Sequence, residues 1–284
     1  MAVRRVPQHR VPLAEGGDRV HRRPRLRPGR RAHLERAPVH LGRGADRILA
    51  RDHVVTGTAV RTSTARTLVR AGAAGQVLFA VVFLVEDATR RGFQPWRQWV
   101  SHLSLGPWGW VNIAALAVAG AGAVLAAVGV ARLLPAGRAR WLPRAIGAYG
   151  GALVLAAVCP IDPGLGWPTG QPPAHTLTGG LHQLAGATIF GGLTVAAWAG
   201  RRLAASGQAG ARWARWSAVT GVTVPASFLL CGILAGLDYS GAWPDAPSGL
   251  FERLALLAGT AWLTAFLAHL AAGPSGPAPN AGRP

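Results

Sequence analysis

The chain has 284 residues, half of them hydrophobic, and its formal net charge of +19 at pH 7 comes from arginine alone, since the sequence contains no lysine. A charge this positive would ordinarily indicate nucleic-acid binding, but nucleic-acid-binding regions usually mix lysine with arginine and interleave aromatic side chains that stack on bases. We therefore expect no nucleic-acid partner, and the lysine-free composition is typical of a very GC-rich bacterial gene.

The first 70 residues differ in composition from the rest of the chain. They hold 17 of the 30 arginines and none of the aromatic residues. Residues 1–68 therefore cannot build a core, and we expect a basic, disordered arm there. Two interpretations of this arm stay open. In one, it is a genuine tail that lies on anionic lipid. In the other, the start site is misassigned, and the arm is translated from GC-rich DNA upstream of a true start at Val54, Val55 or Val60.

Six nearly uncharged apolar stretches follow the arm, at residues 69–86, 110–130, 145–159, 181–199, 217–237 and 250–272. A helix rises about 1.5 Å per residue and the hydrocarbon core of a bilayer is about 30 Å thick, so each stretch is long enough, or nearly so, to cross it. The sequence predicts an all-α bundle of six transmembrane helices over 69–272, followed by a flexible tail at 273–284. The lipid bilayer is the expected partner and the plasma membrane the expected location.

Arginine is concentrated in every second gap between these stretches. Short loops rich in arginine stay in the cytoplasm, so the gaps after the second and fourth stretches are predicted to be cytoplasmic, as are both termini. The gaps at 87–109, 160–180 and 238–249 are then expected to face outward. The arginines that set this orientation are Arg132, Arg138, Arg140, Arg144, Arg201, Arg202, Arg212 and Arg215.

Small residues and cysteines add detail to the predicted bundle. Gly147 with Gly151, and Gly232 with Gly236, have the spacing that lets two helices approach closely, so we expect both pairs to mark helix contacts within the bundle. The two cysteines fall at different predicted depths, so we expect them to pack as small apolar residues without forming a disulfide.

Three segments of the outward-facing part resemble a known bacterial family. The first is Gln-Pro-Trp-Arg-Gln-Trp-Val-Ser-His-Leu-Ser-Leu-Gly from Gln94, with Gly-Trp-Val-Asn ending at Asn112. The second is Cys-Pro-Ile-Asp-Pro from Cys159, with Thr-Gly-Gly-Leu-His ending at His182, and the third is Gly-Leu-Phe-Glu-Arg from Gly249. Together they resemble the family called domain of unknown function 998, over about residues 69–270. The resemblance implies a six-span membrane protein without an established activity.

The outward gaps and the adjacent span ends hold nearly every ionisable group of the membrane part. Such groups are costly in lipid and usually face the bundle interior or a wet cavity, so we expect an outward-facing polar pocket. The candidate catalytic residues are Ser101, His102, Asp162 and His182, of which Asp162 and His182 are also candidate metal ligands. The candidate ligand-binding residues are Ser104, Asn112, Asp238, Glu252 and Arg253.

Two functional interpretations of this pocket stay open. The favoured one is non-enzymatic: the protein binds or moves a small or lipid-like molecule, or it scaffolds partners. In the alternative, the loop between Asp162 and His182 sets carboxylate beside imidazole, giving a metal- or base-dependent hydrolase that acts on lipid at the outer leaflet. No HxxxH, HExxH or CxxC spacing supports the hydrolase, and no motif identifies a cofactor. A purely structural role is also open, with Asp162 capping a helix or pairing with Arg97 and His182 bonding a backbone carbonyl.

Overall fold

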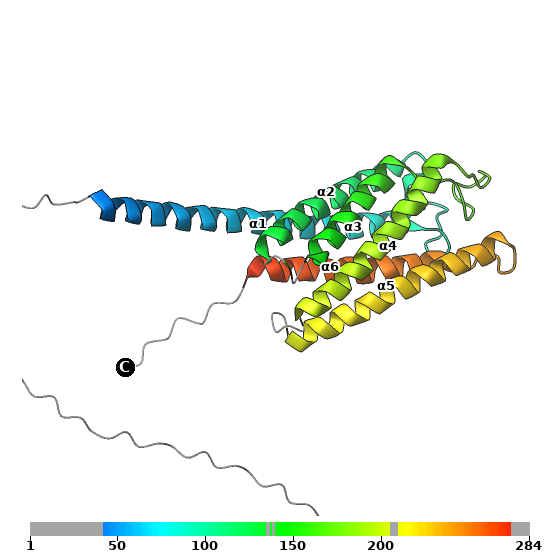
Figure 1. Ribbon diagram of the computed structural model, residues 1–284. Coiled ribbons are helices and arrows are strands. Elements are labelled where there is room, and N and C mark those ends of the chain that lie inside the picture. The colour runs from blue at the N-terminus through cyan, green and yellow to red at the C-terminus, as the bar shows by residue number, and fades with distance from the viewer. Residues whose placement is uncertain (1–41, 135–136, 138–139, 205–209, 274–284) are drawn as a thin grey trace, which may run out of the picture. The chain divides into compact units, whose positions relative to one another are not determined.

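The computed structural model describes residues 42–134, 137, 140–204 and 210–273, with side chains from Arg61 onward (Figure 1). The chain divides into two units, Met1–Arg47 and Ile48–Pro284. No strand occurs in the described ranges, which confirms the predicted all-α class. The elements are α1 (Gly42–Thr89), the 3₁₀ helix η1 (Val100–Ser104), α2 (Gly109–Leu133), α3 (Trp141–Val158), α4 (Leu177–Leu203), α5 (Gly210–Tyr239) and α6 (Ser248–Ala272).

In the part of the chain that the structure describes, five helices are long and apolar enough to cross a membrane: Arg61–Thr89 within α1, and α2, α3, α5 and α6. This confirms a multi-pass membrane protein at the level of length and composition. The fourth helix, α4, has 27 residues and is not among the five, because polar residues such as His182 and Gln183 and repeated glycines reduce its hydropathy.

The first helix begins earlier than the sequence suggests. We expect the membrane part to start at residue 69, whereas α1 starts at Gly42, so the expected boundary lies inside a continuous helix. The candidate start positions Val54, Val55 and Val60 also lie within α1. The disorder expected for 1–41 and for the tail after residue 273 concerns positions outside the described residues.

Prolines and a threonine cap set several helix ends. Pro160 follows the last turn of α3, and proline disfavours continuing a helix because it lacks the N–H group and its ring clashes with the preceding turn. The next helix, α4, begins at the cap Thr176, whose side-chain oxygen accepts a hydrogen bond from Gly179 N at 3.0 Å. Threonine is a favoured residue at this position because its hydroxyl satisfies one of the free amides of the first turn.

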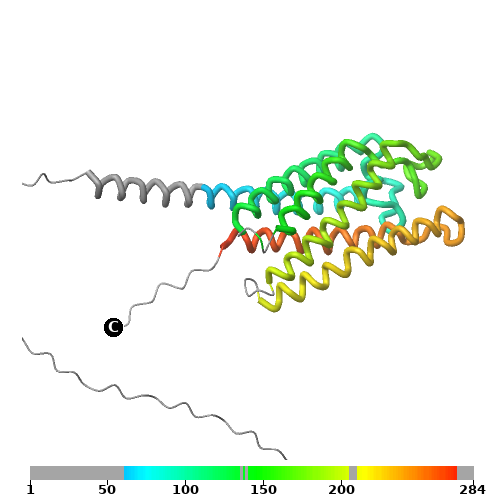
Figure 2. Tube along the Cα trace, in the orientation of Figure 1, coloured from blue at the N-terminus to red at the C-terminus, as the bar shows by residue number. Residues whose placement is uncertain are grey.

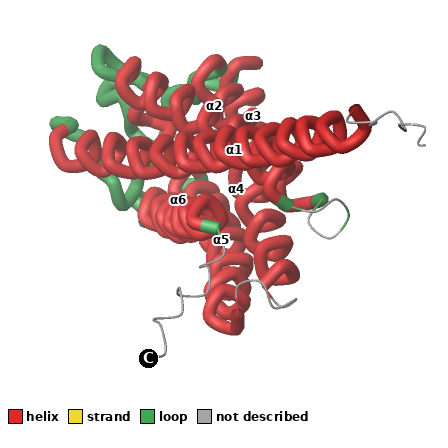
Figure 3. The backbone as a smooth tube through the Cα atoms, turned by 90° about the vertical axis from the view of Figure 1, so that its left-hand side faces the viewer, coloured by secondary structure: helices red, strands yellow, loops and turns green. Residues whose placement is uncertain are grey.

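The segments at 90–108, 159–176 and 240–247 gather at one end of the bundle, which we call the η1 end, while the C-terminal ends of α2 and α4 lie at the opposite end (Figure 2). The three gaps expected to face outward therefore lie together. Figure 3 shows α6 nearly end-on and α1 lengthwise, so α1 crosses α6 obliquely.

Glycine seams join the first three helices. A Cβ atom added to Gly72 would lie 2.4 Å from the Cβ atom of Ala126, and one added to Gly120 or Gly150 would lie 2.7 Å from the carbonyl oxygen of the other. Only glycine allows such close backbone approach, so these positions fix the spacing of α1, α2 and α3.

The glycine pairs that the sequence singled out do not form these seams. A Cβ atom added to Gly151, Gly232 or Gly236 would meet nothing within 4 Å, and one on Gly147 would make only an ordinary 3.6 Å contact with Ala127. The prediction of helix contacts within the bundle is therefore wrong for Gly151, Gly232 and Gly236, whereas Gly147 does face α2. Spacing identifies small residues, but which side of a helix faces its neighbour depends on how the helices pack.

Buried polar side chains tie the helices together near the middle of the bundle. The hydroxyl of Tyr149 on α3 donates to Gln76 on α1, whose amide donates in turn to Ala119 O on α2 at 3.1 Å. Trp262 on α6 donates to Ser217 Oγ on α5 at 3.0 Å. Each donor has found an acceptor, as buried polar groups must when no water reaches them.

Candidate functional site

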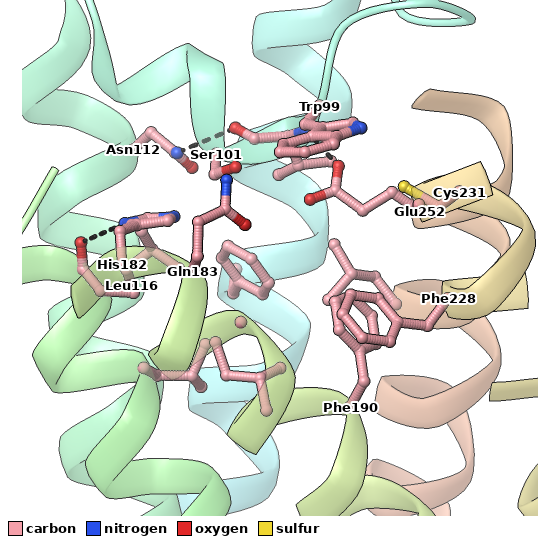
Figure 4. Close-up of a pocket in the computed structure, with 18 residues that line it drawn as sticks. Trp99, Ser101, Asn112, Leu116, His182, Gln183, Phe190, Phe228, Cys231 and Glu252 are labelled. Carbon is pink, nitrogen blue, oxygen red and sulfur yellow. Dashed lines mark hydrogen bonds between the residues drawn. The ribbon is translucent and has the colours of Figure 1, made fainter. Parts of the chain in front are cut away.

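A pocket of about 130 Å³ lies near the η1 end, and all six helices contribute to its wall (Figure 4). Polar groups gather at one end of this pocket, whereas the stacked rings of Phe190 and Phe228, with centroids 4.4 Å apart, lie toward the other. The polar lining residues are Ser101, Asn112, His182, Gln183 and Glu252, beside the indole of Trp99. The apolar lining residues include Phe79, Leu116, Leu153, Ile189, Phe190, Phe228 and Leu256.

Glu252 reaches the polar end of the pocket from the first turns of α6. Its side chain is 8% exposed, and its Oε2 accepts a hydrogen bond from Val100 N at the start of η1. Within the described part of the chain the other oxygen, Oε1, accepts no hydrogen bond, and it points into the pocket (Figure 4). One half of the carboxylate thus holds η1 in place, and the other half is available to a ligand.

Asn112 supports η1 from the opposite side. It is fully buried at the start of α2, and its Nδ2 donates to Val100 O at 3.1 Å and to Ser104 Oγ at 2.9 Å. Its Oδ1 is buried and accepts no hydrogen bond within the described residues. A buried acceptor without a donor is costly, so this oxygen is a second candidate contact for a ligand.

His182 lies in the second turn of α4 and is bound to the end of α3. Its Nδ1 lies 2.8 Å from Cys159 O and 3.2 Å from Ala156 O, and since carbonyl oxygens only accept, Nδ1 carries a proton. In the neutral ring Nε2 is then an acceptor, and it faces the pocket (Figure 4). The expected structural alternative, a bond from His182 to a backbone carbonyl, is confirmed.

Asp162 does not line this pocket. Its carboxylate accepts hydrogen bonds from Thr176 N at 2.7 Å and from Thr176 Oγ1 at 2.6 Å, and it borders a second cavity together with His102 and His175. It thereby fixes the residue that caps α4, rather than pairing with Arg97. The two hydrogen bonds from Thr176 lower the pKa of Asp162. Asp162 and His182 therefore bind different partners and border different cavities.

The lowered pKa of Asp162 predicts an acid-sensitive start of α4. Hydrogen bonds from Thr176 favour the ionised carboxylate in the folded protein, so its contribution is present above the usual carboxyl pKa of about 4 and is lost as pH falls through the lowered value. We expect the amides of Gly179 and Gly180 to exchange hydrogen faster in acid, after correction for intrinsic rates. Asp162→Asn should show the same faster exchange at neutral pH, and exchange equal to wild type would contradict the assignment.

Arg97 is bound between two carboxylates at the η1 end. Its Nε and Nη2 donate to Asp238 at 2.7 and 2.9 Å, and its Nη1 lies 2.5 Å from Asp245 Oδ1. The hydrogen bond to Asp238 raises the pKa of Arg97. Asp238, expected in the pocket, instead joins the end of α5 to the segment before η1.

Arg253 likewise supports the site without lining it. Its Nε and Nη2 donate to both oxygens of Asp87 at 2.7 and 2.6 Å. Its Nη1 donates to Gln98 O at 2.7 Å and to Gly249 O at 2.9 Å. The guanidinium thus joins the end of α1, the segment before η1 and the start of α6, and it is not available to a ligand.

His102 is buried and contacts Trp99 instead of lining the pocket. It is 1% exposed, its Nδ1 accepts a hydrogen bond from Trp99 N at 3.0 Å, and its ring stacks on the Trp99 indole. Burial lowers the pKa of His102 to about 3. Ser104 also faces the protein, as an acceptor for Asn112, whereas Ser101 borders the pocket.

The described residues contain no group of three or more His, Cys, Asp or Glu side chains placed to hold a metal ion. Cys159 and Cys231 are both buried and free. The expected pairing of Asp162 with His182 as metal ligands thus gains no support from the geometry. The residues that sequence reasoning missed are Trp99, Gln183 and the aromatic pair on α4 and α5, because ordinary apolar spans also contain such residues.

Comparison with known proteins places the chain in a family. Searches among curated proteins and among solved structures found no match to the chain. A family model, DUF998, described as a protein of unknown function, matches residues 73–269. This match covers most of the chain and all three segments that carry the resemblance, so the chain belongs to the DUF998 family.

Proposed function

We propose that this protein is a six-span plasma-membrane protein that binds an amphiphilic, lipid-like molecule in the pocket near the η1 end. The lining carries the proposal. Its polar groups can bind a head group, and its apolar wall can contact a hydrocarbon chain. Small-molecule sites commonly combine a few polar groups that set orientation with an apolar lining that provides affinity. Of the residues that the sequence suggests for an outward-facing pocket, Ser101, Asn112, His182 and Glu252 border this one, which supports the proposal.

Connectivity supports the sixth span. The α3 helix ends at the η1 end and α5 begins at the opposite end, so α4 has to run the length of the bundle between them (Figure 1). Its polar first turns then lie in the interfacial region, where polar groups are tolerated. The arginines Arg201 and Arg202 in its last turn favour placing the opposite end in the cytoplasm and the η1 end outside.

We infer that the pocket opens to the bilayer between α4 and α5, which favours a ligand that comes from lipid. Gln183 on α4 and Gly232 on α5 both border the pocket and are both exposed. The two helices are joined where Trp198 Nε1 donates to Gly221 O at 3.1 Å, and they diverge toward the η1 end (Figure 1). An amphiphile could therefore enter between them with its chain still in lipid.

Blocking this opening tests the proposal. Gly232 and Gly236 are exposed on α5 one turn apart, and an added Cβ atom meets nothing within 4 Å at either, but only Gly232 borders the pocket. We expect Gly232→Trp to reduce the amount of lipid-like ligand that copurifies by about tenfold, which corresponds to about 1.4 kcal/mol of binding free energy. Gly236→Trp should keep the wild-type amount.

Native mass spectrometry of the detergent-solubilised protein measures this amount directly. A wild-type protein that carries no ligand and gains none from added total lipid would contradict the proposal. Equal ligand content in the two tryptophan variants would show that the bound lipid sits elsewhere.

A further inference from the structure

We propose that the pocket selects a single-chain amphiphile whose head group is a protonated amine. This inference rests on the proposed function, because it assigns the ligand class of the same pocket.

Three acceptors converge on the polar end of the pocket from three different helices. They are Glu252 Oε1 on α6, Asn112 Oδ1 on α2 and the Nε2 atom of neutral His182 on α4. All three residues are more than nine-tenths buried. None of these atoms receives a hydrogen bond from the described residues, so each lacks a donor. An ammonium group offers three donors and no acceptor, which matches this set.

The charge around the pocket favours a cation. No arginine of the described ranges borders it, and the neighbouring Arg253 already makes four hydrogen bonds to Asp87, Gln98 and Gly249. A phosphate or carboxylate head group would stand beside Glu252 without a counter-charge. Such a pair of like charges is strongly unfavourable in a site with little water, and this repulsion provides specificity.

Aromatic rings complete the environment. The Trp99 indole lies beside the Glu252 carboxylate at the polar end (Figure 4), and the electron-rich face of an indole attracts cations. Its position is fixed by the stack on His102 and by the hydrogen bond of its backbone amide. The pocket volume of about 130 Å³ is small against the several hundred Å³ of typical ligand sites. It therefore suits one head group and the first part of one chain, and the rest leaves through the opening between α4 and α5.

The test compares three probes that share one alkyl chain, dodecylamine, dodecan-1-ol and dodecanoate, by calorimetric titration of the full-length protein in a maltoside detergent. At about pH 8 the amine is protonated and the carboxylate is ionised. The detergent competes equally with all three chains, so differences report on the head group. We expect dodecylamine to bind at least about tenfold tighter than either other probe, the gain that one charge-assisted hydrogen bond provides.

Two variants test whether charge at the pocket, rather than a folding defect, determines the preference for the amine. Glu252→Gln keeps an oxygen for Val100 N but removes the charge, and it should reduce the preference for dodecylamine to less than about threefold. Gln183→Lys, at an exposed position on the rim, tolerates substitution and should move the preference toward dodecanoate.

Each outcome is decisive. If dodecanoate or dodecan-1-ol binds wild type as tightly as dodecylamine, the pocket binds amphiphiles without selecting an amine, and this inference fails while the proposed function stands. If no probe binds, both fail. The assignment would also be overturned if Gln183→Lys, and Glu252→Gln where the Glu252 variant folds, still preferred dodecylamine. The selection would then come from another site.

Discussion

Arg253→Gln is expected to destabilise the protein by about 3–5 kcal/mol, because it leaves the carboxylate of Asp87 buried without a counter-charge. The Asp87 and Arg253 side chains are only 10% and 9% exposed, and both carboxylate oxygens accept hydrogen bonds from the guanidinium. The carbonyls of Gln98 and Gly249 would lose their donor as well. The free energy of unfolding, measured by titration with dodecyl sulfate in mixed micelles, gives the comparison.

Arg91→Gln is the matched control, since Arg91 is an exposed arginine close in sequence to the same end of α1. Its unfolding free energy should stay within about 0.5 kcal/mol of wild type, as for most surface substitutions. The double variant Asp87→Asn with Arg253→Gln should be less damaging than the sum of the two single changes, because no charge is left unpaired. A loss of less than about 1 kcal/mol for Arg253→Gln would contradict the role assigned to this ion pair.

Gly150→Val is expected to cost about 3 kcal/mol, at the upper end of the range for overpacking a core. A Cβ atom at Gly150 would lie 2.7 Å from Gly120 O, 2.8 Å from Val124 N and 2.9 Å from Ala123 Cβ. Two of these three atoms belong to the backbone, so α2 and α3 would have to move apart. The loss should be visible in the same unfolding titration and as a lower midpoint of thermal unfolding.

The control for this substitution is one residue away. Gly151 faces outward from α3, and an added Cβ atom there meets nothing within 4 Å. Gly151→Val should therefore leave stability near the wild-type value. Equal effects of valine at the two positions would show that helix propensity, rather than the contact between α2 and α3, determines the cost.

Part of the candidate site was predictable because polar residues in an apolar chain are conspicuous. Glu252, Asn112 and His182 stand at the ends of apolar stretches, where burial in lipid would be costly, so an interior position follows from their chemistry. Asp238 and Arg253 are likewise ionisable residues at the ends of apolar stretches, yet in the structure both form ion pairs outside the pocket. Sequence alone cannot separate these roles, because both place a charged group at the same depth.

The partners of the charged groups depended on tertiary contacts. Arg97 and Asp162 lie in two gaps that the sequence predicts to face outward, and a pair between them was left open as a structural alternative. Instead, Arg97 binds Asp238, which is 141 positions away in the chain, and Asp162 binds Thr176. Both choices follow from helix packing, which brings the end of α5 beside the segment before η1 and leaves Asp162 next to the start of α4.

The sequence by itself determined the helical class, the multi-pass membrane character, the family and the grouping of the three gaps that it predicts to face outward, because hydropathy, arginine placement and short motifs are properties of local composition. Only the tertiary structure decided which glycines form the seams, which carboxylates are neutralised by arginine and which acceptors remain open to a ligand. These depend on the rotation of each helix about its axis and on the path of η1 between α2 and α6. Both are set by close packing of side chains that lie far apart in the sequence.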